Sequence, residues 1–273
     1  MQELLNHPAV QGGLAPFVAA LAVAFALFSF RLAGLAVVAA LGTAVYLISG
    51  FAFPPGSAQQ KILLISLVVP VLGVILDLAF KPTRAAVPMV GLVFGLLAIW
   101  VAWNILKQKE MAPALATGAG IAALVAWLTG AIFALRDDPV RAGAATLTLG
   151  VGVGVSAFLS GSGSYAQYGI SVAAGAGAFL LVQILLGKTI QAGATFALSA
   201  GAASALIVAG AVLGSPLPWY AAVALALTPV ATLLPLPRTR VWLQAIVATV
   251  YGGIVGLAAC SLSWPELQQR LGL

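Results

Sequence analysis

Asp77 is the only acidic residue inside one of the long apolar stretches of this chain, which makes it the first candidate for chemistry. If that stretch crosses a membrane, an ionised carboxylate there is costly unless it is paired or functional. Lys81 lies four residues later, on the same face of a helix. The spacing predicts an interfacial ion pair that anchors a turn, with a cation or proton site as the alternative.

Gln183 and Gln244 lie at a comparable depth, each within about two helical turns of a basic turn. If their helices pack against the helix that carries Asp77, the three side chains gather in the same half of a bundle. Asp77, Gln183 and Gln244 are therefore a candidate polar cluster. The alternative is that each side chain bridges neighbouring helices, at about 1 kcal/mol per bond.

Two prolines fall near the middles of apolar stretches, Pro70 and Pro229. Each removes a backbone donor and frees a carbonyl one turn earlier. Transporters expose backbone to substrates at broken helices of this kind. Thr228 is placed to cap the carbonyl freed beside Pro229. Pro70, Thr228 and Pro229 are thus candidate helix breaks, with a simple kink as the alternative.

Enzyme and cofactor motifs find little support. His7 and Cys260 are the only histidine and cysteine, so the chain lacks the ligands for a haem, zinc or thiolate site. The sequence at 187–189 ends like a phosphate loop, but Val182 stands where the leading glycine is required. Asp137 and Asp138 share a turn with two arginines, which is typical of a solvated, charge-balanced turn. We expect no enzyme, no metal and no cofactor.

The composition is that of an integral membrane protein. Of 273 residues, 62% are hydrophobic and 7% charged, whereas charged residues make up about a quarter of soluble domains. The mean hydropathy is +1.13. The ends, 1–14 and 262–273, are too short for a core of their own, and we expect no cleavable signal. Residues 1–273 are therefore predicted to form a single integral membrane domain.

Ten apolar runs predict an all-α, polytopic transmembrane helix bundle. Arg31 alone separates the first two runs, and Lys188 and Thr189 alone separate the seventh and eighth, so eight or nine spans are the alternatives. The runs are Ala15 to Phe30, Leu32 to Phe53, Ile62 to Phe80, Ala85 to Leu106, Pro113 to Leu135, Gly143 to Ser160, Tyr168 to Gly187, Ile190 to Gly214, Trp219 to Leu236 and Val241 to Leu262.

Basic residues separate when alternate turns are assigned to opposite sides. One side holds eight and the other four, namely Lys61, Lys107, Lys109 and Arg270. By the positive-inside rule the richer side is cytoplasmic, which predicts a bacterial inner (plasma) membrane protein with both termini on the non-cytoplasmic side. This spread also disfavours nucleic acid as a partner. The predicted cytoplasmic basic turns contain Arg31, Lys81, Arg84, Arg136, Arg141, Lys188, Arg238 and Arg240.

These basic turns recur about every 50 residues, so the chain is interpreted as five helical hairpins in series. The segment Leu76 to Val87 forms one such turn, where Pro82 ends the preceding helix. The alternative explanation of the period is that crossing length alone fixes it.

Pairs of glycines four residues apart occur in three runs, at 91 and 95, 150 and 154, and 252 and 256. Such spacing leaves a smooth groove that lets another backbone come close. The glycine faces predict close packing inside the bundle, or docking of membrane-protein partners or further copies of the chain.

On these grounds the chain is expected to be a permease or transporter-type protein for a small neutral or weakly polar solute or a lipid. Serial hairpins, two mid-span prolines and a sparse polar set favour this hypothesis. A non-catalytic structural or assembly subunit of a larger membrane complex is the alternative. An intramembrane enzyme is the least favoured, for want of a constellation of His, Cys or carboxylate groups.

Overall fold

Helices are the regular structure of the part of the chain that the computed structural model describes: residues 7–30, 32–51, 53–79, 83, 85–215, 217–237 and 240–271, with side chains as far as Trp264. No strand occurs among these residues, and the predicted all-α bundle is confirmed. In chain order the elements are η1 (Val10–Leu14), α2 (Ala15–Leu27), η2 (Phe28–Phe30), α3 (Leu35–Ile48), α4 (Ala58–Ala79), α5 (Ala86–Leu106), α6 (Met111–Ala134), α7 (Pro139–Leu159), α8 (Gly163–Leu186), α9 (Gly193–Gly214), α10 (Trp219–Ala226), α11 (Thr228–Ala231) and α12 (Val241–Leu271).

Eight helical segments of the described chain are long and apolar enough to cross a bilayer, and two apolar segments are shorter. η1, α2 and η2 join into the first of the eight, Val10–Phe30, whereas α3 and the pair α10 and α11 are the short ones. These ten segments correspond to the ten predicted runs. The seventh and eighth runs do not fuse, because Gly187 adopts a left-handed conformation (φ 64°) that ends α8.

Several boundaries differ from the predicted ones. The first span begins at Val10 instead of Ala15. The second ends at Ile48 instead of Phe53, and the ninth leaves the helix after Ala231 instead of Leu236. Apolar composition predicts which residues can lie in the membrane, but it does not by itself predict where a helix begins or ends.

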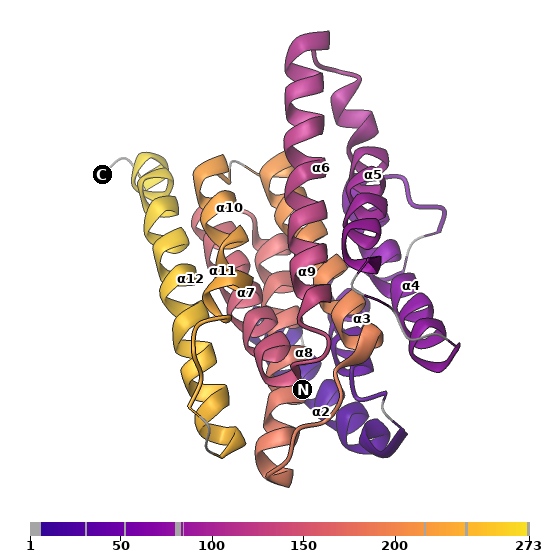
Figure 1. Ribbon diagram of the computed structural model, residues 1–273. Coiled ribbons are helices and arrows are strands. Elements are labelled where there is room, and N and C mark those ends of the chain that lie inside the picture. Colours follow the sequence, from indigo (N-terminus) through magenta and orange to yellow (C-terminus); the bar gives the residue numbers. More distant parts are fainter. Residues whose placement is uncertain are drawn as a thin grey trace.

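α9 is the central helix, and every residue from 194 to 211 is buried. Its alanines, glycines and serines let neighbouring backbones come close. A Cβ added at Gly73 of α4 would lie 2.6 Å from the Thr195 Cα, and one at Gly201 would lie 3.3 Å from the Thr129 Cα of α6. Figure 1 shows α9 in the middle of the bundle, with α12 and α4 at opposite edges.

α5 and α6 form one of the closest helix pairs, through the glycines at 91 and 95. A Cβ added at Gly91 would lie 2.7 Å from the Ala126 carbonyl oxygen, and one at Gly95 would lie 2.8 Å from the Ala122 oxygen. By contrast, α4 and α5 follow each other in the chain but pack mainly on other helices, α4 on α9 and α5 on α6. These two helices are therefore consecutive in the sequence but make little contact with each other.

α7 uses glycines toward two neighbours. A Cβ added at Gly150 would lie 2.7 Å from the backbone nitrogen of Ala173 in α8. On its other side, the Cα of Gly256 in α12 lies 3.4 Å from a Cβ added at Gly152. All three glycine pairs named from the sequence therefore pack against helices of the same chain.

The two described ends of the chain lie at the same end of the bundle. Gly12 of η1 lies against Gln167 near the start of α8. Near the end of α12, the Cys260 Sγ lies 3.7 Å from the Ser156 Oγ of α7. Both ends therefore lie where α7 turns into α8.

Candidate functional site

The ninth span is short, and its helix is interrupted for one residue at Leu227, whose backbone stays in the right-handed helical region (φ −83°, ψ −12°); we call it the broken span. α10 and α11 are divided at Leu227, and together they cover only residues 219–231. Even with Leu227 included, these residues rise about 20 Å at helical spacing, which is less than the roughly 30 Å hydrocarbon core. Residues 233–237, which we call the strap, are not helical and lie between α11 and α12 in the chain.

Side chains from α7 and α12 bind the carbonyls of the strap. Arg141 Nη2 donates to the Leu234 oxygen at 3.3 Å, and Gln244 Nε2 donates to the Pro237 oxygen at 3.1 Å. The Tyr251 hydroxyl donates to the Pro235 oxygen at 3.4 Å. Irregular backbone within a membrane needs such partners because lipid offers none.

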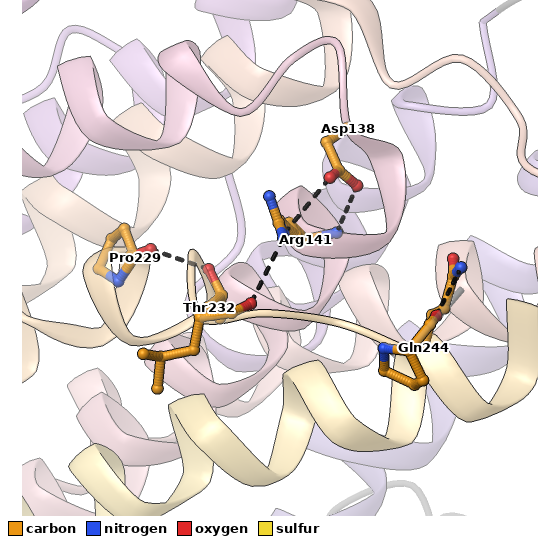
Figure 2. Close-up of polar contacts among 7 residues, drawn as sticks. Asp138, Arg141, Pro229, Thr232 and Gln244 are labelled. Carbon is orange, nitrogen blue, oxygen red and sulfur yellow. Dashed lines mark hydrogen bonds and ion pairs between the residues drawn. The ribbon is translucent and has the colours of Figure 1, made fainter. Parts of the chain in front are cut away.

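Arg141 is held in place by the start of its own helix (Figure 2). Asp138 caps α7, since its Oδ1 accepts the Arg141 backbone N–H at 3.2 Å. The Asp138 Oδ2 lies 3.5 Å from the Arg141 Nε. This carboxylate therefore aims the guanidinium at the strap, and the turn at 136–141 is more than a solvated loop.

The break at Pro229 has its own hydrogen-bond partners. The Trp127 Nε1 of α6 donates to the Ala226 oxygen at 2.8 Å, and the Thr232 hydroxyl donates to the Pro229 oxygen at 2.8 Å. Thr228 is fully buried, and its hydroxyl has no partner among the described residues. Trp127 thus satisfies a carbonyl beside the break, the role that the sequence suggested for Thr228.

Pro70 lies inside α4, which runs without interruption from Ala58 to Ala79. The side chain of Pro70 is buried. One turn earlier, the Ser66 hydroxyl donates to the Ile62 oxygen at 2.8 Å. α4 therefore accommodates its proline, whereas the ninth span divides next to Pro229.

An apolar groove of about 560 Å³ lies between α5, α6 and the broken span. α5 contributes residues from Val87 to Leu92, and α6 contributes residues from Ala126 to Leu135. The remaining wall is Pro229, Val230 and Leu233. Leu92 and Leu233 are more than half exposed, so the groove opens on the apolar surface of the bundle.

A second, smaller groove of about 360 Å³ lies near the described N-terminal end. Ala9 and Gly13 line it from the first helix, Phe158 from α7 and Ile170 from α8. No helix break borders it.

Asp77 binds the start of α9. Its Oδ1 accepts the Ala194 N–H at 2.7 Å, and its Oδ2 accepts the Thr195 N–H at 2.7 Å and the Thr195 hydroxyl at 2.6 Å. The first N–H groups of a helix have no partners within it, and they carry partial positive charge. Asp77 of α4 is therefore an external cap for the central helix.

Gly193 makes this cap possible. Its φ of +64° favours glycine, and an added Cβ would lie 2.6 Å from the Asp77 Oδ2. The Gly193 N–H donates to the Arg136 backbone oxygen at 3.3 Å. The Gln183 Oε1, from α8, accepts the N–H of Ile190 at 3.3 Å. Three other parts of the chain thus fix residues 190–195, which we call the α9 entry.

The candidate polar cluster is distributed over two places. Asp77 and Gln183 both bind the α9 entry, from α4 and α8. Gln244 instead binds the strap from the start of α12 (Figure 2). Lys81, the expected partner of Asp77, lies outside the described residues, so the ion pair remains a prediction.

The predicted basic turns are described in part, since Arg31, Lys81, Arg84 and Arg238 lie outside the described residues. Arg136 is buried; it donates to the Phe133 and Thr83 oxygens, and its guanidinium lies 4.8 Å from the Phe133 ring centre. The Lys188 Nζ lies 5.9 Å from the Phe28 ring centre, and Arg240 is exposed.

Sequence reasoning missed the side chains that complete these sites: Thr195, Trp127 and Tyr251. A signal for the first exists, because Ala192 stands at the N-cap position of α9 and offers no side-chain acceptor. A buried helix start without its own cap requires an acceptor from elsewhere. No comparable signal pairs Trp127 with a carbonyl 99 residues away.

The site therefore consists of the interrupted ninth span, the strap whose carbonyls accept side-chain hydrogen bonds, and the apolar groove beside them. It lies in a bundle whose central helix, α9, is capped by Asp77 of α4. This arrangement offers backbone and apolar surface at one place. Neither the protein-family models nor the curated proteins with which we compared the chain gave a match.

Proposed function

We propose that this multi-pass membrane protein is a permease for a small weakly polar solute or a lipid, and that its substrate passes at the broken ninth span. The observation that carries the proposal is the break at Leu227, followed by the strap and bordered by the apolar groove. Discontinuous helices are where transporters place backbone groups against their substrates.

The strap is held in a way that would let it move during transport. Its described carbonyl bonds come from single side chains, Arg141, Tyr251 and Gln244, and not from a helical ladder. A net side-chain hydrogen bond contributes about 1 kcal/mol, so a few such bonds can exchange at low cost. The groove is apolar, which favours a lipid or a lipid-like amphiphile over a strongly polar solute.

We place the protein in a bacterial inner (plasma) membrane, with the end at which α7 turns into α8 on the non-cytoplasmic side. The basic residues of the opposite turns support this orientation. We propose no catalytic role, because the polar groups of the site bind backbone atoms of the chain itself.

Transport by purified protein in liposomes tests the proposal. One arm follows fluorescent phosphatidylglycerol, whose inner-leaflet share becomes reducible by external dithionite only if it crosses. A second arm follows glycerol by vesicle shrinkage and reswelling. Acceleration of either probe over protein-free vesicles is expected, with the lipid favoured.

A matched pair of variants locates the route. Ala131→Trp fills the groove beside the break, whereas Ala9→Trp makes the same change in the second groove. The first is expected to slow transport and the second to leave it unchanged. Two results contradict the proposal: neither probe moves, or both variants behave alike.

The subunit hypothesis is the alternative. The glycine pairs that motivated it pack inside the chain, so they no longer favour it. Purification in mild detergent tests it directly, because a structural subunit retains companions in fixed ratio and shows no transport alone.

A further inference from the structure

We propose that the tip of the α5–α6 hairpin is a surface for the membrane itself, along which the lipid headgroups lie about one helical turn further out than along α4 and α10. The tip, residues 103–117, contains the end of α5 and the start of α6. This role is separate from transport, because it concerns the bilayer around the protein whether or not a solute is carried.

The tip projects beyond the neighbouring helices (Figure 1). A Cβ added at Gly120 of α6 would lie 3.1 Å from the ring of Trp219, the first residue of α10, so the two helices are level there. Residues 111–119 of α6 precede this level. At helical rise they extend about 13 Å beyond the start of α10.

Apolar side chains of the tip are exposed. Met111 is 81% exposed, Leu115 65% and Trp103 50%. Trp103 continues a row of exposed apolar residues on α5 that contains Leu96 and Trp100, at the three- and four-residue spacing of one helix face. Large exposed apolar surfaces mark contact with protein or with membrane, and this one extends the lipid-facing row of α5.

Pairs of lysine and tryptophan mark the level of the headgroups on α4 and on the tip. Tryptophan rings lie at the membrane–water interface, where the ammonium groups of lysines reach lipid headgroups. The Lys61 Nζ of α4 lies 4.8 Å from the Trp100 ring centre. The Lys107 Nζ lies 5.2 Å from the ring centre of Trp103, which is about 4.5 Å further out along α5.

α6 gives the same offset relative to α10. The Lys109 Nζ lies 3.4 Å from the Thr117 hydroxyl oxygen. Thr117 lies three residues outside Gly120, which is level with Trp219. This ammonium group therefore also lies about 4.5 Å beyond the tryptophan of the neighbouring helix. Both helices of the hairpin thus indicate a step of about one turn.

A protein is the competing occupant of an exposed apolar tip. Lys107 and Lys109 favour lipid, because they hold their ammonium groups at one level on two helices, as a headgroup layer requires. A protein partner imposes no common level. Glu110 is exposed at the outer turn and offsets one of the two positive charges. Residues 111–119 carry no charge that could fix the register of a protein partner.

Spin-label depth in liposomes of the purified protein tests the proposal. Ala116 and Ser57 are a matched pair of exposed residues, since Ala116 lies four residues outside Gly120 and Ser57 four residues outside Lys61. Nitroxides are attached to Ala116→Cys and Ser57→Cys in a Cys260→Ser protein. The vesicles contain equal parts of phosphatidylcholine and phosphatidylglycerol, and depth is measured from accessibility to oxygen and to a water-soluble nickel chelate. We expect the label at 116 to lie about 4–5 Å deeper than the label at 57, the height of the step.

Lysine variants supply a second measurement. The double variant Lys107→Gln with Lys109→Gln removes both ammonium groups of the tip, so it should shrink the depth difference between the two labels. Lys61→Gln removes the ammonium group on α4 and should leave the depth of the label at 116 unchanged. All three lysines are on the surface of the bundle or at its edge, so their replacement leaves the core intact.

Three results would overturn the proposal. Equal depths of the two labels would mean that the headgroups lie at one level and that the tip stands in water. Low accessibility of the label at 116 to both oxygen and nickel would mean that protein covers the tip, and dipolar broadening that grows with protein concentration would identify a second copy. A depth difference that the double lysine variant leaves unchanged would contradict the headgroup contact. These readouts report depth, so their outcome is independent of the transport assay.

Discussion

Removal of the Asp77 carboxylate should destabilise the bundle through the start of α9. Asp77 accepts three hydrogen bonds from Ala194 and Thr195 at 2.6–2.7 Å. An N-cap contributes about 0.5–2 kcal/mol, and favourable charge at a helix start adds about 0.3–1 kcal/mol. Because the stranded donors are partly buried, we expect Asp77→Ala to cost about 3 kcal/mol.

Asp77→Asn should be milder, at about 1–2 kcal/mol. Its remaining oxygen can still accept the Ala194 N–H, and the Thr195 hydroxyl can rotate to accept from the new amide. The Thr195 N–H, however, loses its acceptor, and the negative charge at the helix start is gone. This cost exceeds the 0–1 kcal/mol expected if Asp77 only paired with Lys81 at the membrane surface.

The measurement is a double-mutant cycle on unfolding free energy in detergent, with Thr195→Val and Lys81→Gln as second sites. Coupling of about 1 kcal/mol or more between positions 77 and 195 is expected, with little coupling to 81. If Asp77→Ala unfolds the protein, the cycle proceeds from Asp77→Asn. Strong coupling to Lys81 alone, or a silent Asp77→Ala, would refute the cap.

Three further predictions concern the rest of the bundle. A reporter active only in the cytoplasm should work when fused after Asp138 and fail after Gly163; the reverse pattern would invert the orientation. Gly150→Ala should destabilise the protein, because its Cβ would lie 2.7 Å from a backbone nitrogen. The Cβ of Gly253→Ala meets nothing within 4 Å, so this variant should stabilise the protein by up to about 1 kcal/mol. Thermal unfolding measures both effects. Trp127→Phe removes the donor to the broken span and should cost about 1–2 kcal/mol in the same assay, and an unchanged melting temperature would contradict that role.

The spans could be predicted from the sequence because bilayer thickness imposes a length on each apolar run. The strap could not, since residues 219–236 carry no charge and are mostly apolar, and composition does not separate a helix from extended chain. The alternating prolines at 235 and 237 were the available signal, because neither can donate a helical backbone bond.

The sequence indicated the depth of the polar residues but not the partners that the structure describes, and the Asp77–Lys81 pair itself stays a prediction because Lys81 lies outside the described residues. Asp77 was matched with Lys81 because only local spacing is visible in a single sequence, whereas its described partners lie 117 and 118 residues away. Gln183 and Gln244 do sit near the basic end, but each satisfies a backbone group close to itself in sequence. Depth in the membrane follows from hydropathy, and rotation about each helix axis does not.

The central position of α9 has a consequence for biogenesis. α4 and α6 are synthesised before the helix on which they pack, so they must enter the membrane without their final neighbour. Until α9 arrives, the Asp77 carboxylate has none of its α9 donors. Its place within about one turn of the end of α4 lets headgroup water solvate the charge in the meantime. Asp77 is therefore synthesised before the helix start that it caps, and insertion of α9 supplies its hydrogen-bond donors.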